Sequence, residues 1–140
     1  SDVTPRHLIH DTNGELMPQR ILIVDDDIDI CHFFQKIMKE MGYEVDTAYG
    51  GRECIAKIRR DPPDILFLDI KMPKMSGLEC LRRVRYIKHK LPIVMITGYG
   101  DVQSAQEAMR LGADEYISKP FDLGNIRQVI TELLGETEKP

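Results

Sequence analysis

The chain has 140 residues, of which 42% are hydrophobic and 30% are charged, and its formal net charge is -4 at pH 7. These values are ordinary for one soluble globular domain, and the acidic balance gives no electrostatic footprint for nucleic acid. No apolar run approaches the roughly 18 residues of a membrane span, and the polar N-terminus lacks the apolar stretch of a signal peptide. We therefore expect a cytoplasmic domain that contacts neither DNA nor a membrane.

Residues 1–18 differ in composition from the rest of the chain. They contain two prolines and an Asn13-Gly14 turn signal, with only scattered apolar residues. Two interpretations are open: a flexible extension or linker, or a small hairpin in which Leu8-Ile9 and Leu16-Met17 flank the turn.

Strand and helix patterns alternate through residues 19–136, and a polar tail follows at 137–140. Short apolar runs predict strands at about 20–25, 44–48, 64–69, 92–97 and 114–118. Apolar residues at helical spacing predict helices near 28–41, 51–60, 77–88, 101–111 and 122–134. Cys31, Cys54 and Cys80 all lie in these predicted helices and lack CxxC spacing, so we expect reduced, partly buried thiols.

Five successive strand–helix units predict an α/β fold with a parallel sheet and helices on both of its faces. The first and third strands are the most apolar, so we expect them to be central. This places the five-stranded parallel sheet in the flavodoxin-like order 2-1-3-4-5.

Polar side chains stand at the carboxyl ends of four of these strands. Asp25-Asp26, Asp69, Thr97 and Lys119 each follow or close an apolar run. Binding sites of open α/β sheets form at those ends, so we expect these groups on one rim. Two unit charges about 4 Å apart repel by roughly 4 kcal/mol at an effective dielectric near 20, and a hard divalent cation relieves that repulsion. A carboxylate can also accept a phosphoryl group as a nucleophile.

Four segments at this rim carry a family resemblance. They are Ile21-Leu-Ile-Val-Asp-Asp-Asp27, Leu68-Asp-Ile-Lys-Met-Pro-Lys-Met-Ser-Gly77, Ile96-Thr-Gly-Tyr-Gly100 and Tyr116-Ile-Ser-Lys-Pro-Phe121. In this order and at these spacings, residues 19–135 resemble the receiver domain of two-component response regulators. One departure is Gly98, where the family commonly has alanine.

The resemblance implies a phosphoacceptor and a metal site. Asp69 would accept the phosphoryl group. Mg²⁺, for which Mn²⁺ could substitute, would be held by Asp25, Asp26, Asp69 and the backbone carbonyl of Lys71.

The resemblance also implies a switch. Thr97 and Lys119 would contact the phosphoryl oxygens, and Tyr116 would rotate as Thr97 moves. Loop geometry would depend on three further residues: Pro73, Gly77 and Pro120, the last after a cis peptide bond. From their positions, Lys71 and Tyr99 could shield the site from water, which predicts a phosphorylated lifetime of minutes or longer.

The partners implied by the resemblance are a sensor histidine kinase or phosphotransfer protein, and a downstream effector outside this chain. A homodimer through the helix at 101–111, the strand at 114–118 and the helix at 122–134 is a further option. The segment from Thr97 to Met109 resembles regulators whose outputs often control transcription. We expect no turnover of a separate substrate, because the chain would catalyse only its own phosphorylation and dephosphorylation.

Other interpretations remain open from the residues. A phosphohydrolase with an aspartyl nucleophile commonly has a second aspartate two positions later, where this chain has Lys71. A binding module could keep the fold without being phosphorylated. Asp25-Asp26 could merely begin a helix, a role that we expect for Asp27. A calcium loop is excluded, because Ile30 replaces its required glycine.

Overall fold

The computed structural model describes residues 7–135. Its strands are β1 (Leu8–His10), β2 (Leu16–Pro18), β3 (Arg20–Val24), β4 (Glu44–Ala48), β5 (Ile65–Asp69), β6 (Ile93–Thr97) and β7 (Glu115–Ser118). Its helices are α1 (Ile28–Glu40), α2 (Gly51–Arg60), α3 (Gly77–Ile87), α4 (Val102–Arg110) and α5 (Leu123–Leu134). Every predicted strand and helix of the main domain is present, with bounds that differ by only a residue or so.

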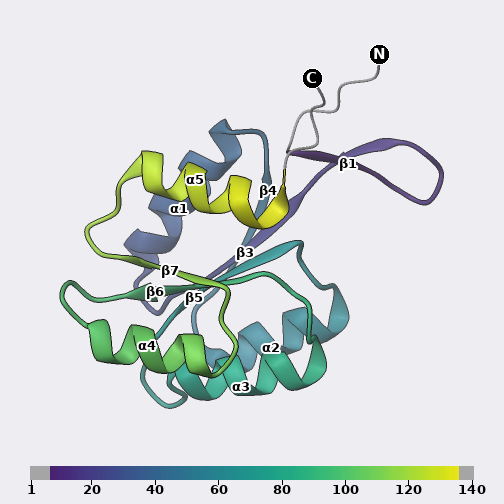
Figure 1. Cartoon of the computed structure of the whole chain (residues 1–140). Helices are drawn as coiled ribbons and strands as arrows, with labels where there is room; N and C mark the ends of the chain where they lie inside the picture. The colour runs from purple at the N-terminus through teal and green to yellow at the C-terminus, as the bar shows by residue number, and fades with distance from the viewer. Residues whose placement is uncertain (1–6, 136–140) are drawn as a thin grey trace.

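The main sheet has five parallel strands in the order β4-β3-β5-β6-β7. Counted from β3, this is the predicted order 2-1-3-4-5. Helices α1 and α5 cover one face of the sheet, and α2, α3 and α4 cover the other (Figure 1). The predicted α/β class and topology are therefore confirmed.

Successive residues of the central strands enter two separate apolar layers. Ile21 and Ile23 of β3 pack with Phe34 on the α1–α5 side, whereas Leu22 and Val24 pack with the α2–α4 side. All five residues of β5 are buried, as expected for a strand covered by helices on both faces. The sheet is thus packed between two apolar layers, which position its carboxyl-end rim.

Polar residues begin several of the helices. The carboxylate of Asp27 accepts the backbone N–H of Asp29 at 2.9 Å, which confirms that Asp27 caps α1. Asp101 caps α4 and Asp122 caps α5 in the same way. Gly42 follows α1 with a φ of 97°, a left-handed conformation that favours glycine at a helix end.

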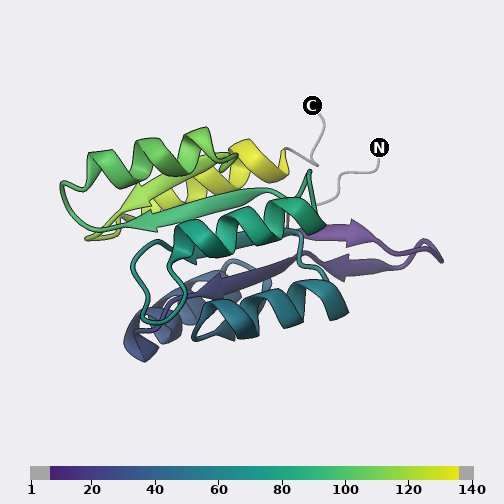
Figure 2. The ribbon, with the colours of Figure 1, turned by 90° about the horizontal axis from the view of Figure 1, so that it is seen from below.

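Residues 8–18 form a hairpin, the second of the two interpretations of this segment. β1 and β2 are antiparallel, with Leu8 opposite Pro18. In the turn, the Asp11 carboxylate accepts the backbone N–H groups of Asn13 and Glu15 at 2.9 and 2.8 Å. The hairpin projects from the sheet end opposite the carboxyl-end rim (Figures 1 and 2).

The three cysteines lie in α1, α2 and α3, and all are buried and free. Among residues 7–135, no helix has both the length and the apolar character needed to cross a bilayer.

Candidate phosphorylation and metal site

Four neighbouring strands bring the predicted site residues to one rim of the sheet. Asp69 closes β5, and Asp25 directly follows β3, which pairs with β5 in parallel. Thr97 closes β6 on the other side of β5, and Lys119 directly follows β7. Because parallel strands end on the same side, local strand endings become a single three-dimensional site.

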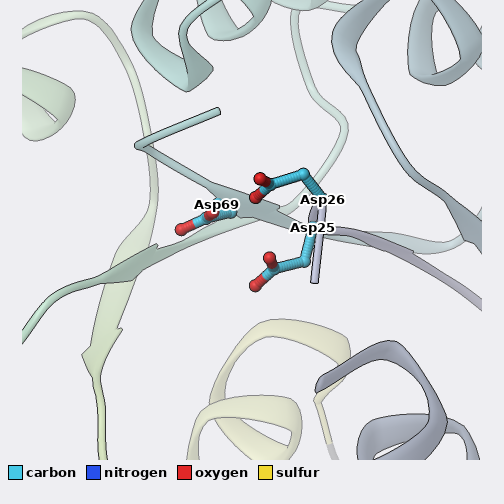
Figure 3. A group of neighbouring side chains, drawn as sticks. All are labelled: Asp25, Asp26 and Asp69. Atoms are coloured by element: carbon cyan, nitrogen blue, oxygen red, sulfur yellow. The ribbon is translucent and has the colours of Figure 1, made fainter. Parts of the chain in front are cut away.

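Three carboxylates gather at the centre of this rim. Asp25, Asp26 and Asp69 each offer one oxygen atom, and these atoms lie within 4.8 Å of one another. Figure 3 shows the three carboxylates side by side, with Asp25 and Asp26 coming from adjacent positions and Asp69 from the neighbouring strand. Asp25 is fully buried and Asp69 is 4% exposed, whereas Asp26 is open to solvent. A ligand can therefore approach this group of acids from the Asp26 side.

The buried acids are only partly compensated by the protein. The backbone N–H of Asp27 donates to Asp25 Oδ1 at 2.9 Å, while Asp25 Oδ2 is buried without a hydrogen bond among the described residues. Lys119 Nζ lies 3.4 Å from this Oδ2 and 3.8 Å from Asp69 Oδ1. One ammonium group thus serves two buried carboxylates, with a third nearby.

This arrangement raises the pKa values of both buried acids. Burial raises the pKa of Asp69 to about 7, with a further contribution from the negative charge of Asp25 and opposition from Lys119. Burial likewise raises the pKa of Asp25, against the Asp27 N–H group and Lys119. The site therefore has more negative charge than its own cation neutralises.

A divalent cation fits this donor set. The available ligand atoms are carboxylate oxygens, which Mg²⁺ prefers, and the buried Oδ2 of Asp25 has the 3.4 Å ion pair with Lys119 but no hydrogen bond within residues 7–135. A bound cation would also lower the cost of holding these acids ionised. Asp25, Asp26 and Asp69 could therefore hold a divalent metal ion.

The predicted switch residues lie beside this acidic group. Thr97 is 2% exposed, and its hydroxyl donates to the Ile117 carbonyl of β7 at 3.3 Å. Tyr116, on the same strand, is 40% exposed. The Thr97 hydroxyl is therefore engaged with the backbone of β7, so any movement toward Asp69 must break that bond.

The loops around the rim are closely fitted. The Lys119–Pro120 peptide bond is cis. A side chain on Gly77 would clash with the backbone carbonyl of Asp69, and the Gly77 N–H donates to the Ile70 carbonyl at 2.6 Å. In the intervening segment, which contains Pro73, Lys74 has a φ of 70°. Gly77 is thus required by close packing, and the left-handed Lys74 had no sequence signal.

One contact at the rim was not predicted. Lys71 Nζ lies 3.7 Å from the carboxylate of Asp101, the residue that caps α4. The signal available in the sequence was the opposite charge of two residues placed just after adjacent strands. Tyr99 is 87% exposed, and shielding of the site by Lys71 and Tyr99 stays a prediction.

Comparisons with known proteins agree with this geometry. Residues 21–131 match the model of the response regulator receiver domain. The chain is 33% identical over 119 residues to sporulation initiation phosphotransferase F of Bacillus subtilis, and the match covers 85% of this chain and 96% of that protein. It is 31% identical to the transcriptional regulatory protein ZraR of Salmonella typhimurium over 85% of this chain but 27% of that protein. The chain thus spans about a quarter of the length of the ZraR relatives it matches.

Solved structures give the same result. The receiver domain of NtrX from Brucella abortus superimposes with a TM-score of 0.79 at 34% identity, covering 81% of this chain and 97% of that domain. The chemotaxis protein CheY4 of Vibrio cholerae gives a TM-score of 0.77 at 32% identity, covering 82% of this chain and 98% of that chain.

Proposed function

This chain belongs to the family of response regulator receiver domains and is a phosphoacceptor receiver of two-component signal transduction, and we propose that Asp69 is the residue that accepts the phosphoryl group. The observation that carries this proposal is the position of its carboxylate. Asp69 ends a central, fully buried strand, with the oxygens of Asp25 and Asp26 within 4.8 Å. The Nζ atom of Lys119 lies 3.8 Å from Oδ1 of Asp69.

In the proposed reaction, the donor is a phosphohistidine of a sensor kinase or of a phosphotransfer protein. One oxygen of the Asp69 carboxylate attacks the phosphorus atom and forms an O–P bond. The N–P bond breaks, and the histidine nitrogen keeps its electron pair. The product is an aspartyl phosphate, so the chain catalyses its own modification and, with water as acceptor, its own dephosphorylation.

The residues around Asp69 prepare it for this attack. Asp25 and Asp26, with Asp69 and the backbone carbonyl of Lys71, would hold Mg²⁺ or Mn²⁺. When bound, that ion supplies positive charge to the phosphoryl oxygens, on which negative charge is spread in the transition state. Lys119 adds a second positive group and opposes the rise in the pKa of Asp69, because a nearby ammonium favours the ionised form of a carboxyl.

The same residues would carry the signal outward. Phosphorylation increases the charge and the number of acceptor oxygens at Asp69. Thr97 would then exchange its bond to the Ile117 carbonyl for one to the phosphoryl group, and Tyr116 would turn into the vacated space. A coupling of roughly 1–3 kcal/mol to the surface of α4, β7 and α5 is enough for a useful switch.

The surface of α4, β7 and α5 would contact a downstream effector or a second copy of the chain. The phosphoryl transfer would take place in the cytoplasm. ZraR and AtoC of Escherichia coli are named as regulatory proteins, the former as transcriptional, which supports transcription as one output.

Intact-mass spectrometry after incubation with acetyl phosphate and Mg²⁺ tests the acceptor. The parent should gain one phosphoryl group, and Asp69→Asn should gain none. Asp46→Asn is the matched control, because this exposed aspartate is paired with Lys57 on the surface and should leave labelling unchanged. Equal labelling of Asp69→Asn and the parent would refute the assignment.

Amide chemical shifts test the switch separately. A phosphoryl mimic with Mg²⁺ should move the signals of residues 97–118 in the parent. Unchanged shifts in that segment, in a protein that is shown to be phosphorylated at Asp69, would contradict the role of Thr97 and Tyr116 without touching that of Asp69.

A further inference from the structure

The positive charge of this acidic protein is concentrated on two neighbouring helices. α2 has four basic residues and one acid, and α3 has three basic residues and one acid. In α1, α4 and α5, the acids and the lysines and arginines are equal in number. Helices α2 and α3 lie beside each other on one face of the sheet (Figures 1 and 2). Among the five helices, α2 and α3 therefore carry the excess of basic residues, and the side of the molecule that they form is here named the α2–α3 face.

Part of this charge serves the fold and part faces solvent. Lys57 pairs with Asp46 at 2.9 Å, and Arg85 pairs with Asp114 at 2.8 Å. In contrast, Arg52, Arg59 and Arg82 are exposed and form no ion pair within residues 7–135. Exposed arginines that have no carboxylate partner of their own are free to bind one from another molecule.

The α2–α3 face is hollowed between the two helices. A hollow of about 960 Å³ lies at their N-terminal ends, and a second of about 320 Å³ lies farther along. Arg83 lines both, so the two hollows lie next to each other along the helix pair, and together they are here named the groove. α3 has 11 residues and is roughly 16 Å long, so the groove has room for a peptide of several residues.

The groove offers apolar contacts as well as charge. Ile55 and Ile87 line the smaller hollow, and Met75 lines the larger one. A tyrosine stands in each hollow: Tyr49 is 42% exposed and Tyr86 is 86% exposed. Tyrosine and arginine around an apolar floor are the residue types that most often dominate the binding energy of protein interfaces.

We propose that the groove between α2 and α3 docks an acidic segment of a partner protein that carries apolar side chains between its carboxylates. Arg52, Arg59 and Arg82 would pair with the carboxylates, and the groove floor would receive the apolar side chains. At one end this groove reaches the loop of Pro73 and Lys74, beside the phosphorylation site, and it includes no residue of α4, β7 or α5.

Acidic residues in the groove favour an acidic peptide over a nucleic acid or an anionic membrane surface. Glu53 and Glu79 line the larger hollow. A nucleic acid presents a phosphate at every step and would place some of them against these acids. A peptide can space its carboxylates to avoid them. A membrane surface has no segment that enters a groove, and it would meet the same two acids.

The first experiment is a selection from a library of random linear peptides on the immobilised chain at physiological ionic strength. Selected sequences should be rich in Asp and Glu alternating with apolar residues. They should bind the double variant Arg59→Glu/Arg82→Glu at least roughly tenfold more weakly. The matched control Lys36→Glu/Arg127→Glu, with the same charge change on α1 and α5, should bind them like the parent.

Amide shifts then locate the peptide, and binding should move the signals of residues 49–59 and 73–87. All variants should keep the parent's melting temperature and acetyl phosphate labelling, which separates docking from folding and from phosphorylation. The proposal is overturned if no acidic sequence is enriched, if both double variants bind equally, or if shifts fall elsewhere. It is also overturned if a DNA duplex or phosphatidylserine vesicles bind the face more tightly, or if sedimentation shows that a second copy occupies it.

Discussion

The carboxyl-end rim carries buried negative charge, whereas the α2–α3 face carries exposed positive charge. At the rim, Asp25 and Asp69 are buried, so their charge is costly and their pKa values rise. On the α2–α3 face, Arg59 and Arg82 are exposed, where water and salt screen their repulsion. Burial makes it costly to ionise the first group without a nearby cation, whereas exposure lets the second group stay charged and unpaired at little cost to stability. In the two proposals above, this difference in burial prepares the rim for chemistry and the α2–α3 face for recognition.

The largest expected effect concerns Asp25, the most deeply buried acid. Asp25→Asn should weaken Mg²⁺ binding on the order of a hundredfold, because a charged ligand close to the ion is lost. The measurement is an Mg²⁺ titration followed by amide shifts. Asp46→Asn, an exposed acid away from the rim, should bind Mg²⁺ like the parent. Similar affinities for Asp25→Asn and the parent would mean that Asp25 does not face the ion.

The next effect is a pH dependence of stability caused by Asp69. Its pKa rises from 3.8 to about 7 on folding, so the folded state binds the proton more tightly than the unfolded state. Metal-free protein should therefore lose stability as the pH rises from about 4 to about 7, by on the order of 3 kcal/mol.

Urea unfolding of the parent and of Asp69→Asn at several pH values, without metal, measures this contribution. The difference in unfolding free energy between the two proteins should grow through that range in favour of Asp69→Asn. Saturating Mg²⁺ should reduce the pH dependence of the parent. A difference that is constant from pH 4 to pH 7 would show that Asp69 is not buried in this way.

A smaller effect is expected at Thr97, a buried neutral group of the rim. Thr97→Ala removes the hydrogen bond to the Ile117 carbonyl and should cost about 1 kcal/mol of stability. Urea unfolding measures the loss, and Thr97→Ser, which keeps the hydroxyl, is the control. An equal loss in both variants would point to the methyl group instead of the hydroxyl.

The smallest effect is expected on the α2–α3 face. Arg83 pairs with Glu79 at 3.0 Å with more than half of its side chain exposed, so Arg83→Gln should change the unfolding free energy by about 0.5 kcal/mol or less. High salt should remove most of that difference. A loss as large as the one expected for Thr97→Ala would show that this exposed ion pair contributes to the fold as strongly as the buried hydrogen bond of Thr97.

Much of the fold follows from local sequence patterns. Alternating apolar runs and helical spacings located the five sheet strands and five helices, and the most apolar runs at 21–24 and 65–68 marked the central strands. Asp25, Asp69, Thr97 and Lys119 were recognisable as rim residues because each stands at a strand end, and parallel strands end on one side. These inferences succeed because they depend on neighbouring residues and on one general property of parallel sheets.

Packing between distant segments decided the rest. Only the structure shows that residues 8–18 form a hairpin and not an extension. It also shows that Lys119 lies near both Asp25 and Asp69. The ion pair between Lys71 and Asp101 is likewise seen only in the structure. It also separates the arginines of α3, because Arg85 is tied to Asp114 while Arg82 stays free. The sequence by itself determined which residues form strands and helices and which polar residues gather at one rim of the sheet. Burial and groove shape depend on surfaces that meet only after folding, and so they came from the tertiary structure alone.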